Sequence, residues 1–439
     1  MKKTYSFPQG GLVFEDPYAP PQGALTETAF LPVFSVIPLI QHTGNKAYPI
    51  VFIGEYVKEG MLIGRGQGQG SANIHATVPG KIVRMVSWKT VDGIANEALV
   101  IRMEGSFERL GKKEIVYQWI DLPPSELQRL IAEYGIVEMD EEGKPIADIF
   151  GDLATEKEAI TVVIRCVFDN PWFAADRAIC NERIMAVVEG SLITAKACGA
   201  TSIIYAVSYK EKQIIDNIQK TVQILHDSES VNIPIAVVSV GNRYPQHNRR
   251  ELELVLREYE KKENILLGRL FMVCPSTASA IHDAVKFHKP ILDRYVAVGG
   301  SAVKTPKVLK VRIGMRLRDV FEQCGGLITD PARIVIGSPL LGRTVLDLDE
   351  PITKTSYAVL ALLAKEIGGT VPRSCIDCGE CRAVCPVGID PEALYKQIIC
   401  IPENPPLVDC HGCGCCEVVC PSRLPIGTTI YAVSKGAHI

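Results

Sequence analysis

Apolar and polar residues alternate in short runs over the first quarter of the chain. A period of two residues, with glycine and proline between the runs, predicts short β-strands joined by turns. The apolar runs cover residues 34–40, 49–54, 61–64, 74–80, 81–85 and 98–102. We therefore expect a small β domain over residues 1–115.

The pattern changes to strand–helix alternation in the second part of the chain. Residues 116–135 have helical character, with a capping box from Ser125 to Gln128 and Gly135 as the stop. An acidic loop over 136–145 is expected next. Continuous apolar runs that predict buried strands alternate with helical segments, in the order strand 161–165, helix 176–198, strand 202–208, helix 210–225 and strand 233–240. This order predicts a parallel sheet covered on both faces, in an α/β domain over residues 116–292.

The remaining segments predict two smaller units. A helix over 276–286 precedes strands over 295–303 and 308–313, and a helical segment ends before Gly325-Gly326. We assign this unit to residues 293–345. An apolar helix over 356–366 is expected to lead into a cysteine-rich region, so the last unit covers residues 346–439.

Composition and charge narrow the class of protein. The chain has 439 residues, of which 47% are hydrophobic and 22% charged, and 47 basic residues face 50 acidic ones. Such a balance excludes a basic nucleic-acid-binding surface. No apolar run reaches the eighteen or so residues of a membrane span, and Met1–Pro8 lacks the apolar core of a signal peptide. We expect a cytoplasmic protein that could reach a membrane only through a partner.

Two cysteine runs carry the chemistry of the last unit. Each run has the spacing C-x2-C-x2-C-x3-C-P, from Cys375 to Pro386 and from Cys410 to Pro421. In two-cluster ferredoxins the fourth cysteine of each run binds the other cluster. The spacing thus predicts two [4Fe–4S] clusters, one held by Cys375, Cys378, Cys381 and Cys420, the other by Cys410, Cys413, Cys416 and Cys385. A structural zinc site or disulfides are the alternatives, and the duplicated spacing and the reducing compartment argue against both.

Other polar and thiol side chains have ordinary structural interpretations. Buried structural thiols are favoured for most of the other cysteines, although Cys166 and Cys274 could be redox thiols. The remaining members of this group are Cys180, Cys198, Cys324, Cys400 and Cys415, the last a bystander inside the second run. We interpret His42 as a buried hydrogen-bonded residue, His247 as part of a turn and Trp172 as core.

Two stretches resemble known small domains. Residues 54–63 have the pattern G-x-x-V-x-x-G-x-x-I, and 76–82 follow as Ala-Thr-Val-Pro-Gly-Lys-Ile. Together they resemble the barrel-sandwich hybrid domain of lipoyl and biotinyl carriers, without the modified lysine in its usual hairpin. A plain β-barrel would be predicted by the same pattern. Residues 295–326 resemble an SLBB domain, a β-grasp unit.

The order of these parts resembles the RnfC-like family, named after the C component of the Rnf electron-transport complex. The flavoprotein of complex I shares the α/β core and the SLBB unit. Matching stretches are residues 38–44, 243–246, 277–278 and 337–342. The resemblance implies a multidomain fold with a barrel-sandwich hybrid, a complex-I-flavoprotein-like α/β core, an SLBB unit and a helical two-cluster ferredoxin module. It also implies a family site in which FMN takes hydride from NADH.

Two motifs of that FMN site are altered. The family places a glycine-rich loop, roughly G-x-G-G-A-G-F-P, after a G-I-V turn, whereas this chain continues from Gly135-Ile-Val137 into Glu138-Met-Asp-Glu-Glu-Gly-Lys-Pro145. A phosphate needs free backbone N–H groups, and carboxylates repel it. The family's N-G-A-E-C-E-P stretch is replaced by residues 165–171, and both glutamates are lost. We therefore expect no bound FMN and assign no catalytic or nucleotide-binding residue.

These patterns predict an iron–sulfur electron-transfer protein that passes electrons from a donor protein to a terminal reductase. Divergent relatives of the family suggest proline reductase as one such acceptor. The alternative is an NAD(P)H-oxidising, FMN-dependent protein with a rebuilt nucleotide site. A third class is an assembly scaffold whose clusters are structural.

Overall fold

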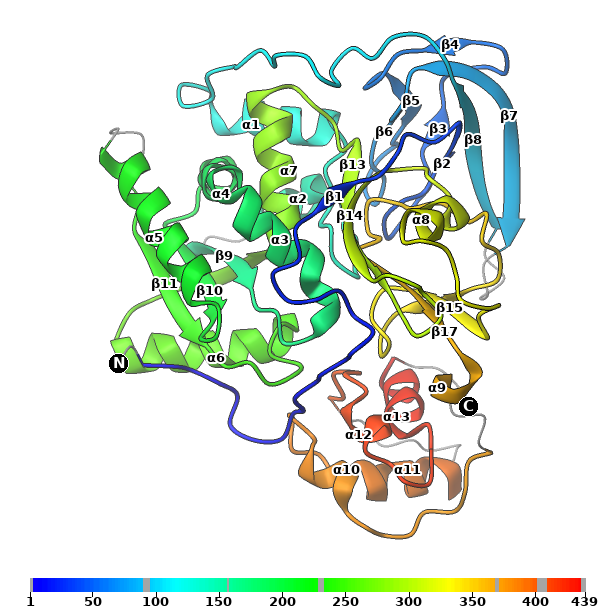
Figure 1. Ribbon diagram of the computed structural model, residues 1–439. Coiled ribbons are helices and arrows are strands. Elements are labelled where there is room, and N and C mark those ends of the chain that lie inside the picture. The colour runs from blue at the N-terminus through cyan, green and yellow to red at the C-terminus, as the bar shows by residue number, and fades with distance from the viewer. Residues whose placement is uncertain are drawn as a thin grey trace.

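The computed structural model describes residues 3–89, 95–155, 158–227, 233–367, 371–400 and 409–435. Figure 1 shows a β unit, an α/β unit and a second β unit packed together, with a small helical module below them. None of the helices among these residues has the length and apolar character needed to cross a membrane.

The first β unit consists of two facing antiparallel sheets. One sheet has the order β2 (Phe34–Pro38), β8 (Ala95–Met103), β7 (Gly80–Lys89) and β4 (Tyr56–Val57). The other has the order β3 (Tyr48–Pro49), β5 (Leu62–Arg65) and β6 (Ile74–His75). Apolar side chains from both sheets, among them Ile37, Ile63 and Leu99, form one buried core. The predicted β domain is thus confirmed.

The α/β unit has a parallel sheet with helices on both faces. Its strand order is β11 (Ile235–Val240), β10 (Ser202–Ser208), β9 (Ile160–Cys166) and β12 (Arg269–Val273). The covering helices are α1 (Pro124–Glu133), α2 (Ile146–Ala154), α3 (Ala174–Glu182), α4 (Ile184–Cys198), α5 (Lys212–Asp227), α6 (Arg249–Glu263) and α7 (Pro275–Lys286). Separate apolar clusters pack on the two faces of the sheet, as the continuous apolar strands predict.

Two helix predictions in this unit are wrong in detail. The helix expected over 176–198 is two helices, because Arg183 leaves the helical region at φ −129° and the chain turns there. The helix expected over 116–135 begins only at Pro124, because two successive prolines fit a helix start and not its interior. Gly199 ends α4 in the left-handed conformation at φ 67°, as predicted.

The second β unit is a six-stranded sheet. Its order is β1 (Glu27–Thr28), β14 (Lys307–Arg312), β13 (Asp293–Gly299), β17 (Ala358–Leu362), β15 (Arg333–Ile336) and β16 (Arg343–Val345), and α8 (Leu317–Gln323) packs on it. The apolar run 356–366 was expected to be a helix, which is wrong. Its residues form β17 between β13 and β15, and only α9 (Ala364–Ile367) follows as a helix. A short apolar run cannot be distinguished from a buried strand by periodicity alone.

The helical module contains α10 (Glu380–Ala383), α11 (Pro391–Cys400), α12 (Cys415–Val418) and α13 (Ile426–Ser434). The N-terminal segment holds this module against the α/β unit (Figure 1). Tyr5 pairs with Val240, and Leu12 pairs with Tyr244. The Gly11 N–H donates to the carbonyl of Val384, at 2.9 Å, inside the first cysteine run.

Candidate functional site

The two cysteine runs have the same local backbone. Gly379 and Gly414 both lie at φ 77°, each directly before a short helix, α10 or α12. Two positions earlier, Asp377 (φ 56°) and Gly412 (φ 68°) are also left-handed. An aspartate rarely adopts this conformation outside tight turns. The repeated sequence therefore produces two loops of one design, each presenting three thiols.

The second predicted ligand set surrounds one small cavity. Cys385, Cys410, Cys413 and Cys416 all line it, together with Cys415. The first of these belongs to the first run, so the fold brings the fourth cysteine of one run to three cysteines of the other. This arrangement fits the ligand set that crossed coordination requires.

The first predicted ligand set packs around the apolar core of the helical module. Cys375, Cys381 and Cys420 belong to the same apolar cluster. Their segments are tied together, because the Ser422 hydroxyl donates to the Ser374 carbonyl at 2.8 Å. Cys378 is exposed. The Asp377 N–H points to the Cys375 sulfur at 3.5 Å, the kind of contact that stabilises a cluster thiolate.

The donor set fits iron–sulfur clusters: the thiols are gathered, most are buried, and no disulfide joins them. A [4Fe–4S] cluster held there would supply one-electron transfer. Among the described residues, one further group has metal-ligand proximity, with Cys375, Asp377 and Glu392 inside 4.8 Å of one another. Both of its carboxylates already contact Lys396.

Most of the remaining cysteines are buried, as predicted. Cys166, Cys180, Cys274, Cys324 and Cys415 are buried, Cys198 is half-buried and Cys400 is exposed. The sulfurs of Cys166 and Cys180 lie 3.8 Å apart, beyond bonding distance.

A residue that the sequence did not single out joins the module to the α/β unit. Tyr244 is fully buried, and its hydroxyl donates to the Cys413 carbonyl at 2.7 Å. Beside it, His411 contacts Glu251 at 2.5 Å, and Arg250 pairs with Asp409 at 2.6 Å. The matched stretch 243–246 contained the signal, but we connected it with the nucleotide pocket and not with the cysteines.

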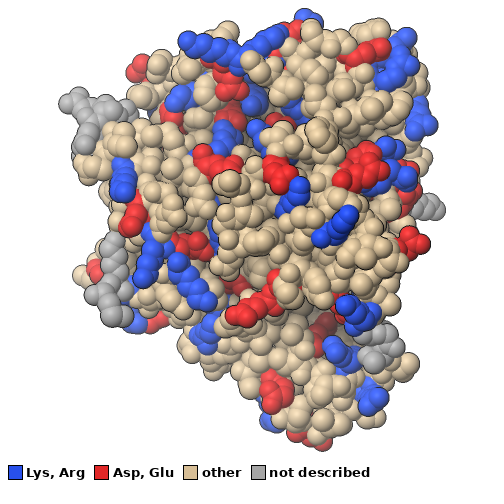
Figure 2. All heavy atoms as spheres, viewed as in Figure 1, with Lys and Arg blue, Asp and Glu red and all other residues tan. Residues whose placement is uncertain are grey.

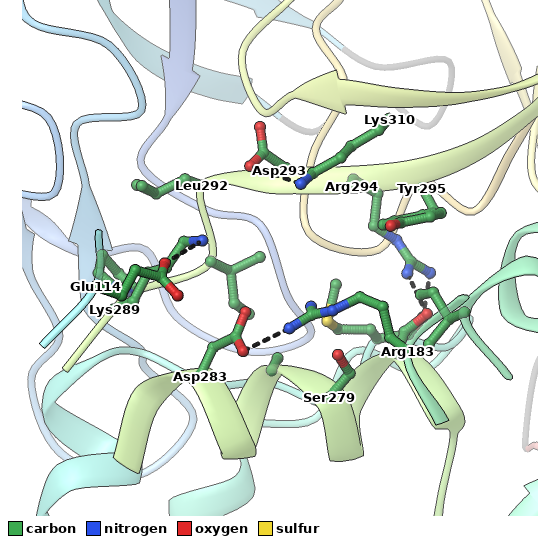
Figure 3. Close-up of a pocket in the computed structure, with 16 residues that line it drawn as sticks. Glu114, Arg183, Ser279, Asp283, Lys289, Leu292, Asp293, Arg294, Tyr295 and Lys310 are labelled. Carbon is green, nitrogen blue, oxygen red and sulfur yellow. Dashed lines mark hydrogen bonds and ion pairs between the residues drawn. The ribbon is translucent and has the colours of Figure 1, made fainter. Parts of the chain in front are cut away.

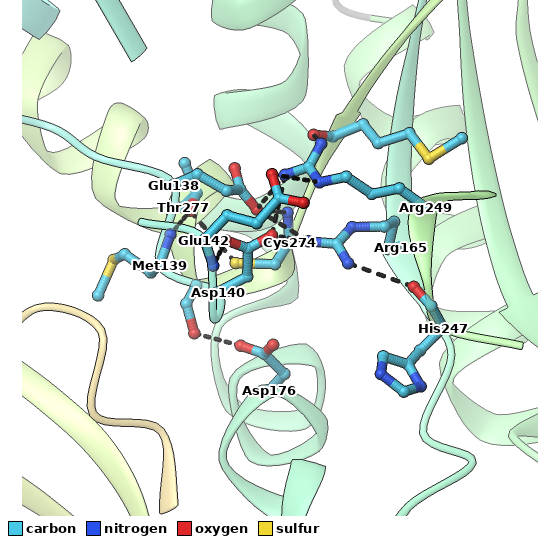
Figure 4. A network of polar contacts seen from close by, with 12 residues as sticks. Glu138, Met139, Asp140, Glu142, Arg165, Asp176, His247, Arg249, Cys274 and Thr277 are labelled. Atoms are coloured by element: carbon cyan, nitrogen blue, oxygen red, sulfur yellow. Dashed lines mark hydrogen bonds and ion pairs between the residues drawn. The ribbon is translucent and has the colours of Figure 1, made fainter. Parts of the chain in front are cut away.

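The two altered motifs of the expected nucleotide site meet in a network of ion pairs (Figure 4). Arg165 contacts Asp140 at 2.6 Å and Glu138 at 3.2 Å. Arg249, at the start of α6, contacts Asp140 at 2.9 Å. The carboxylates of the acidic loop are thus neutralised by arginines, one of which stands at the first position of the altered 165–171 stretch.

Burial separates the pKa values of the two loop carboxylates. Burial and the nearby Asp140 raise the pKa of Glu138 to about 7, although Arg249 and Arg165 oppose the shift. Burial also acts to raise the pKa of Asp140, but Arg249 and Arg165 outweigh it and hold this pKa at about 2. One oxygen of Glu138 has no partner among the described atoms. At neutral pH the loop therefore holds one firm negative charge and one carboxyl close to its titration point.

We expect Glu138→Gln to stabilise the protein more at pH 8 than at pH 5. The folded protein keeps a proton that the unfolded chain releases between pH 4.5 and about 7, so stability falls as pH rises through this window. Glutamine cannot ionise, and its advantage at pH 8 should be roughly 1–3 kcal/mol. Thermal unfolding at both pH values measures it. Glu142→Gln, in the exposed part of the loop, is the control, and an equal effect at both pH values would contradict the expectation.

The space beside this network is small for a nucleotide. About 100 Å³ remains, between Glu141, Arg165, His247 and Tyr357, whereas ligand pockets usually measure about 300–1,000 Å³. The Cys274 N–H donates to Glu138 at 2.8 Å, and the Tyr357 hydroxyl donates to Glu141. Donors that a phosphate would need are thus used by carboxylates, and these surroundings do not fit FMN.

The other polar candidates have structural roles. His42 is buried and accepts the Ala72 N–H at 3.0 Å, and burial lowers the pKa of its imidazole. His247 contacts Asp169 at 2.8 Å beside the ion-pair network. Trp172 is buried and donates to Asp16 at 3.0 Å. The interpretations of His42 and Trp172 as core residues are confirmed.

Comparison with known families matches three parts of the chain. Residues 9–106 match the RnfC barrel sandwich hybrid domain, residues 131–265 the Nuo51 FMN-binding domain, and residues 295–345 the SLBB domain. The second match contains the acidic loop and the ion-pair network.

Curated relatives match most of the chain. The C component of the ion-translocating oxidoreductase complex of Rhodobacter capsulatus is 28% identical over 85% of this chain and 71% of its own length. The C component of the proton-translocating ferredoxin:NAD(+) oxidoreductase complex of Clostridium ljungdahlii is 29% identical over 84% of this chain and 79% of its own length. Among solved structures, an NAD+-reducing [NiFe]-hydrogenase in the H2-reduced state has a TM-score of 0.46 and 13% identity, covering 63% of this chain and 53% of that chain.

Proposed function

This chain belongs to the RnfC-like family, and we propose that it is an iron–sulfur electron-transfer protein without the family's flavin site. The observation that carries the proposal is the cavity lined by Cys385, Cys410, Cys413 and Cys416. Four thiols from two distant runs converge there, which a scaffold without a cluster would not need. We propose the crossed ligand sets, four cysteines for each of two [4Fe–4S] clusters.

The altered pocket supports the loss of flavin. In place of free amides it presents Glu138, Asp140 and Glu141, and the arginines that could hold a phosphate are paired with them. Reopening the pocket for a phosphate would break buried ion pairs, which is costly. The second candidate function, an NAD(P)H-oxidising flavoprotein with a rebuilt site, is favoured by the matched FMN-binding domain alone.

The two ligand sets differ in their access to partners. Tyr244 and the N-terminal segment cover the loop of Cys413, which is 9% exposed. The other loop is open, with Cys378 exposed and Ile376 at 65% exposure. We propose that the partner protein docks at the Cys378 loop, because electron transfer weakens steeply with distance.

Two arginines mark this docking face. Arg373 and Arg423 are exposed and lie on segments joined by the bond from the Arg373 N–H to the Ser422 carbonyl, at 2.9 Å. Neither has a carboxylate partner among the described residues. Elsewhere on the face seen in Figure 2, acidic and basic side chains are interspersed. An unpaired positive pair beside an exposed apolar residue suits a partner with an acidic docking surface.

The relatives' names include ferredoxin and NAD(+) as reactants and describe complexes of several proteins. We propose that this chain likewise works between a donor protein and a reductase, with proline reductase as one acceptor to test. We place it in the cytoplasm, with membrane contact only through a partner.

Iron analysis and a redox titration test the proposal. The anaerobically purified protein should contain about eight iron atoms and take up about two electrons in one-electron steps. The measurements are iron per chain and a dye-mediated titration followed by electron paramagnetic resonance. About four irons, bound zinc, or clusters that do not reduce reversibly would favour the scaffold or zinc alternatives.

A further inference from the structure

A second cavity lies away from the cysteines and from the ion-pair network. It measures about 270 Å³ and lies between α7, the end of α3 and the strands β13 and β14 (Figure 3). At roughly 30 Å³ per water it could hold about nine waters, or one compact metabolite. Its walls come from the α/β unit and from the six-stranded sheet, so an occupant would contact both.

The ionic side chains around the cavity are mostly paired. Arg183 contacts Asp283 at 2.6 Å, and Lys289 contacts Glu114 at 3.2 Å. Lys310 is only loosely paired, since its nitrogen is 3.9 Å from Asp293. The same aspartate is shared with Arg312, at 3.2 Å. The ammonium group of Lys310 is therefore the cation at the rim that is most available to a ligand.

Arg294 differs from these because it is fully buried and has no direct carboxylate partner among the described residues. Its two terminal nitrogens donate to the Ser276 hydroxyl at 2.6 Å and to the Met139 carbonyl at 2.8 Å. Its Nε has no partner among the described atoms. The nearest negative charge, Asp176, is reached only through Ser276. A buried guanidinium held by neutral oxygens favours an anion in the adjacent space.

Ser279 supplies the second observation. Its side chain lies on the cavity side of α7, as Figure 3 shows, and the residue is only 2% exposed. Its hydroxyl has no hydrogen-bond partner among the described residues, although a buried hydroxyl normally has one. Ser279 also lies near the N-terminus of α7, where the helix dipole favours negative charge.

We propose that this cavity binds a small metabolite carrying an oxyanion group, a carboxylate or a phosphate. The oxyanion would accept from Ser279 and lie in the field of Arg294 and Lys310. The rest of the ligand would fill the space toward Lys289 and Glu114. By contacting α7 and β13 together, it would stabilise the packing of the two units.

Titration of the iron-loaded protein with inorganic phosphate, acetate and malonate tests this, with sodium chloride at equal ionic strength as reference. At least one oxyanion should raise the thermal midpoint saturably, as preferential binding to the folded state requires, and calorimetry should give its Kd. A response to phosphate alone or to carboxylates alone decides between the two sources. If no oxyanion exceeds chloride, the proposal is wrong.

Two variants locate the site. Ser279→Val removes the hydroxyl and fills space, and Lys310→Gln removes the rim charge without touching the core. Each should weaken binding about tenfold, whereas Lys304→Gln, an exposed lysine that does not line the cavity, should not. Unchanged binding in both site variants would overturn the assignment. Iron content should stay at the wild-type level in all three, which separates this test from that of electron transfer.

Discussion

Cys385→Ala should lose about half of the bound iron, although its own run keeps three cysteines. Cys385 shares a cavity with Cys410, Cys413 and Cys416 of the other run. In the crossed arrangement it is the fourth ligand of their cluster. The variant should fall from about eight to about four irons, or convert the affected cluster to a three-iron form. Iron analysis and electron paramagnetic resonance of the reduced protein measure the loss.

Two comparisons identify the affected cluster. Cys378→Ser should damage the other cluster, so its resonance spectrum should complement that of Cys385→Ala. Cys415→Ser is the matched control, because this cysteine is buried beside the same cavity and lies outside the predicted ligand spacing. Loss of the cluster of the first run in Cys385→Ala would contradict the crossed arrangement, and loss of iron in Cys415→Ser would shift the ligand assignment.

Removing the unpaired positive charges near Cys378 should slow electron exchange with an acidic carrier about tenfold at low ionic strength. The double variant is Arg373→Glu with Arg423→Asn. Asparagine is chosen because Arg423 is left-handed at φ 53°. The probe is a reduced, acidic two-cluster ferredoxin, and the measurement is the second-order rate constant by stopped flow, with binding affinity as a second readout.

The control carries the same change in charge away from this face. Lys212→Glu with Lys220→Gln, on α5, lies far from the module in Figure 1. It should exchange electrons at nearly the wild-type rate, and dithionite should reduce both variants and the wild type equally. A rate that is unchanged in the arginine variant, or equally slow in the lysine variant, would remove the docking face from the Cys378 loop.

Much of the fold follows from local patterns. The strand–helix alternation from residue 160 onward predicts the parallel sheet because each apolar run is flanked by turn residues and an amphipathic helix. The failures occur where tertiary contacts decide. Residues 358–362 are a strand because β13 and β15 flank them, and Glu27–Thr28 is a strand only through its pairing with β14.

The site was predictable to a similar degree. The cysteine spacing places the thiols because cluster coordination imposes it on the sequence. The acidic loop indicated a changed pocket, but its pairing with Arg165 and Arg249 depends on strand and helix ends that meet only in the fold. The contact from Tyr244 to Cys413 joins residues 169 positions apart, and no local pattern reveals it.

The most direct test of the central claim measures flavin and electron entry together. The anaerobically purified protein is denatured for flavin fluorescence, and the native protein is mixed separately with NADH and with reduced ferredoxin while cluster absorbance is followed. We predict no stoichiometric flavin, no reduction by NADH with or without a viologen acceptor, and rapid reduction by ferredoxin. One flavin per chain together with sustained NADH oxidation would contradict the account and establish the rebuilt nucleotide site.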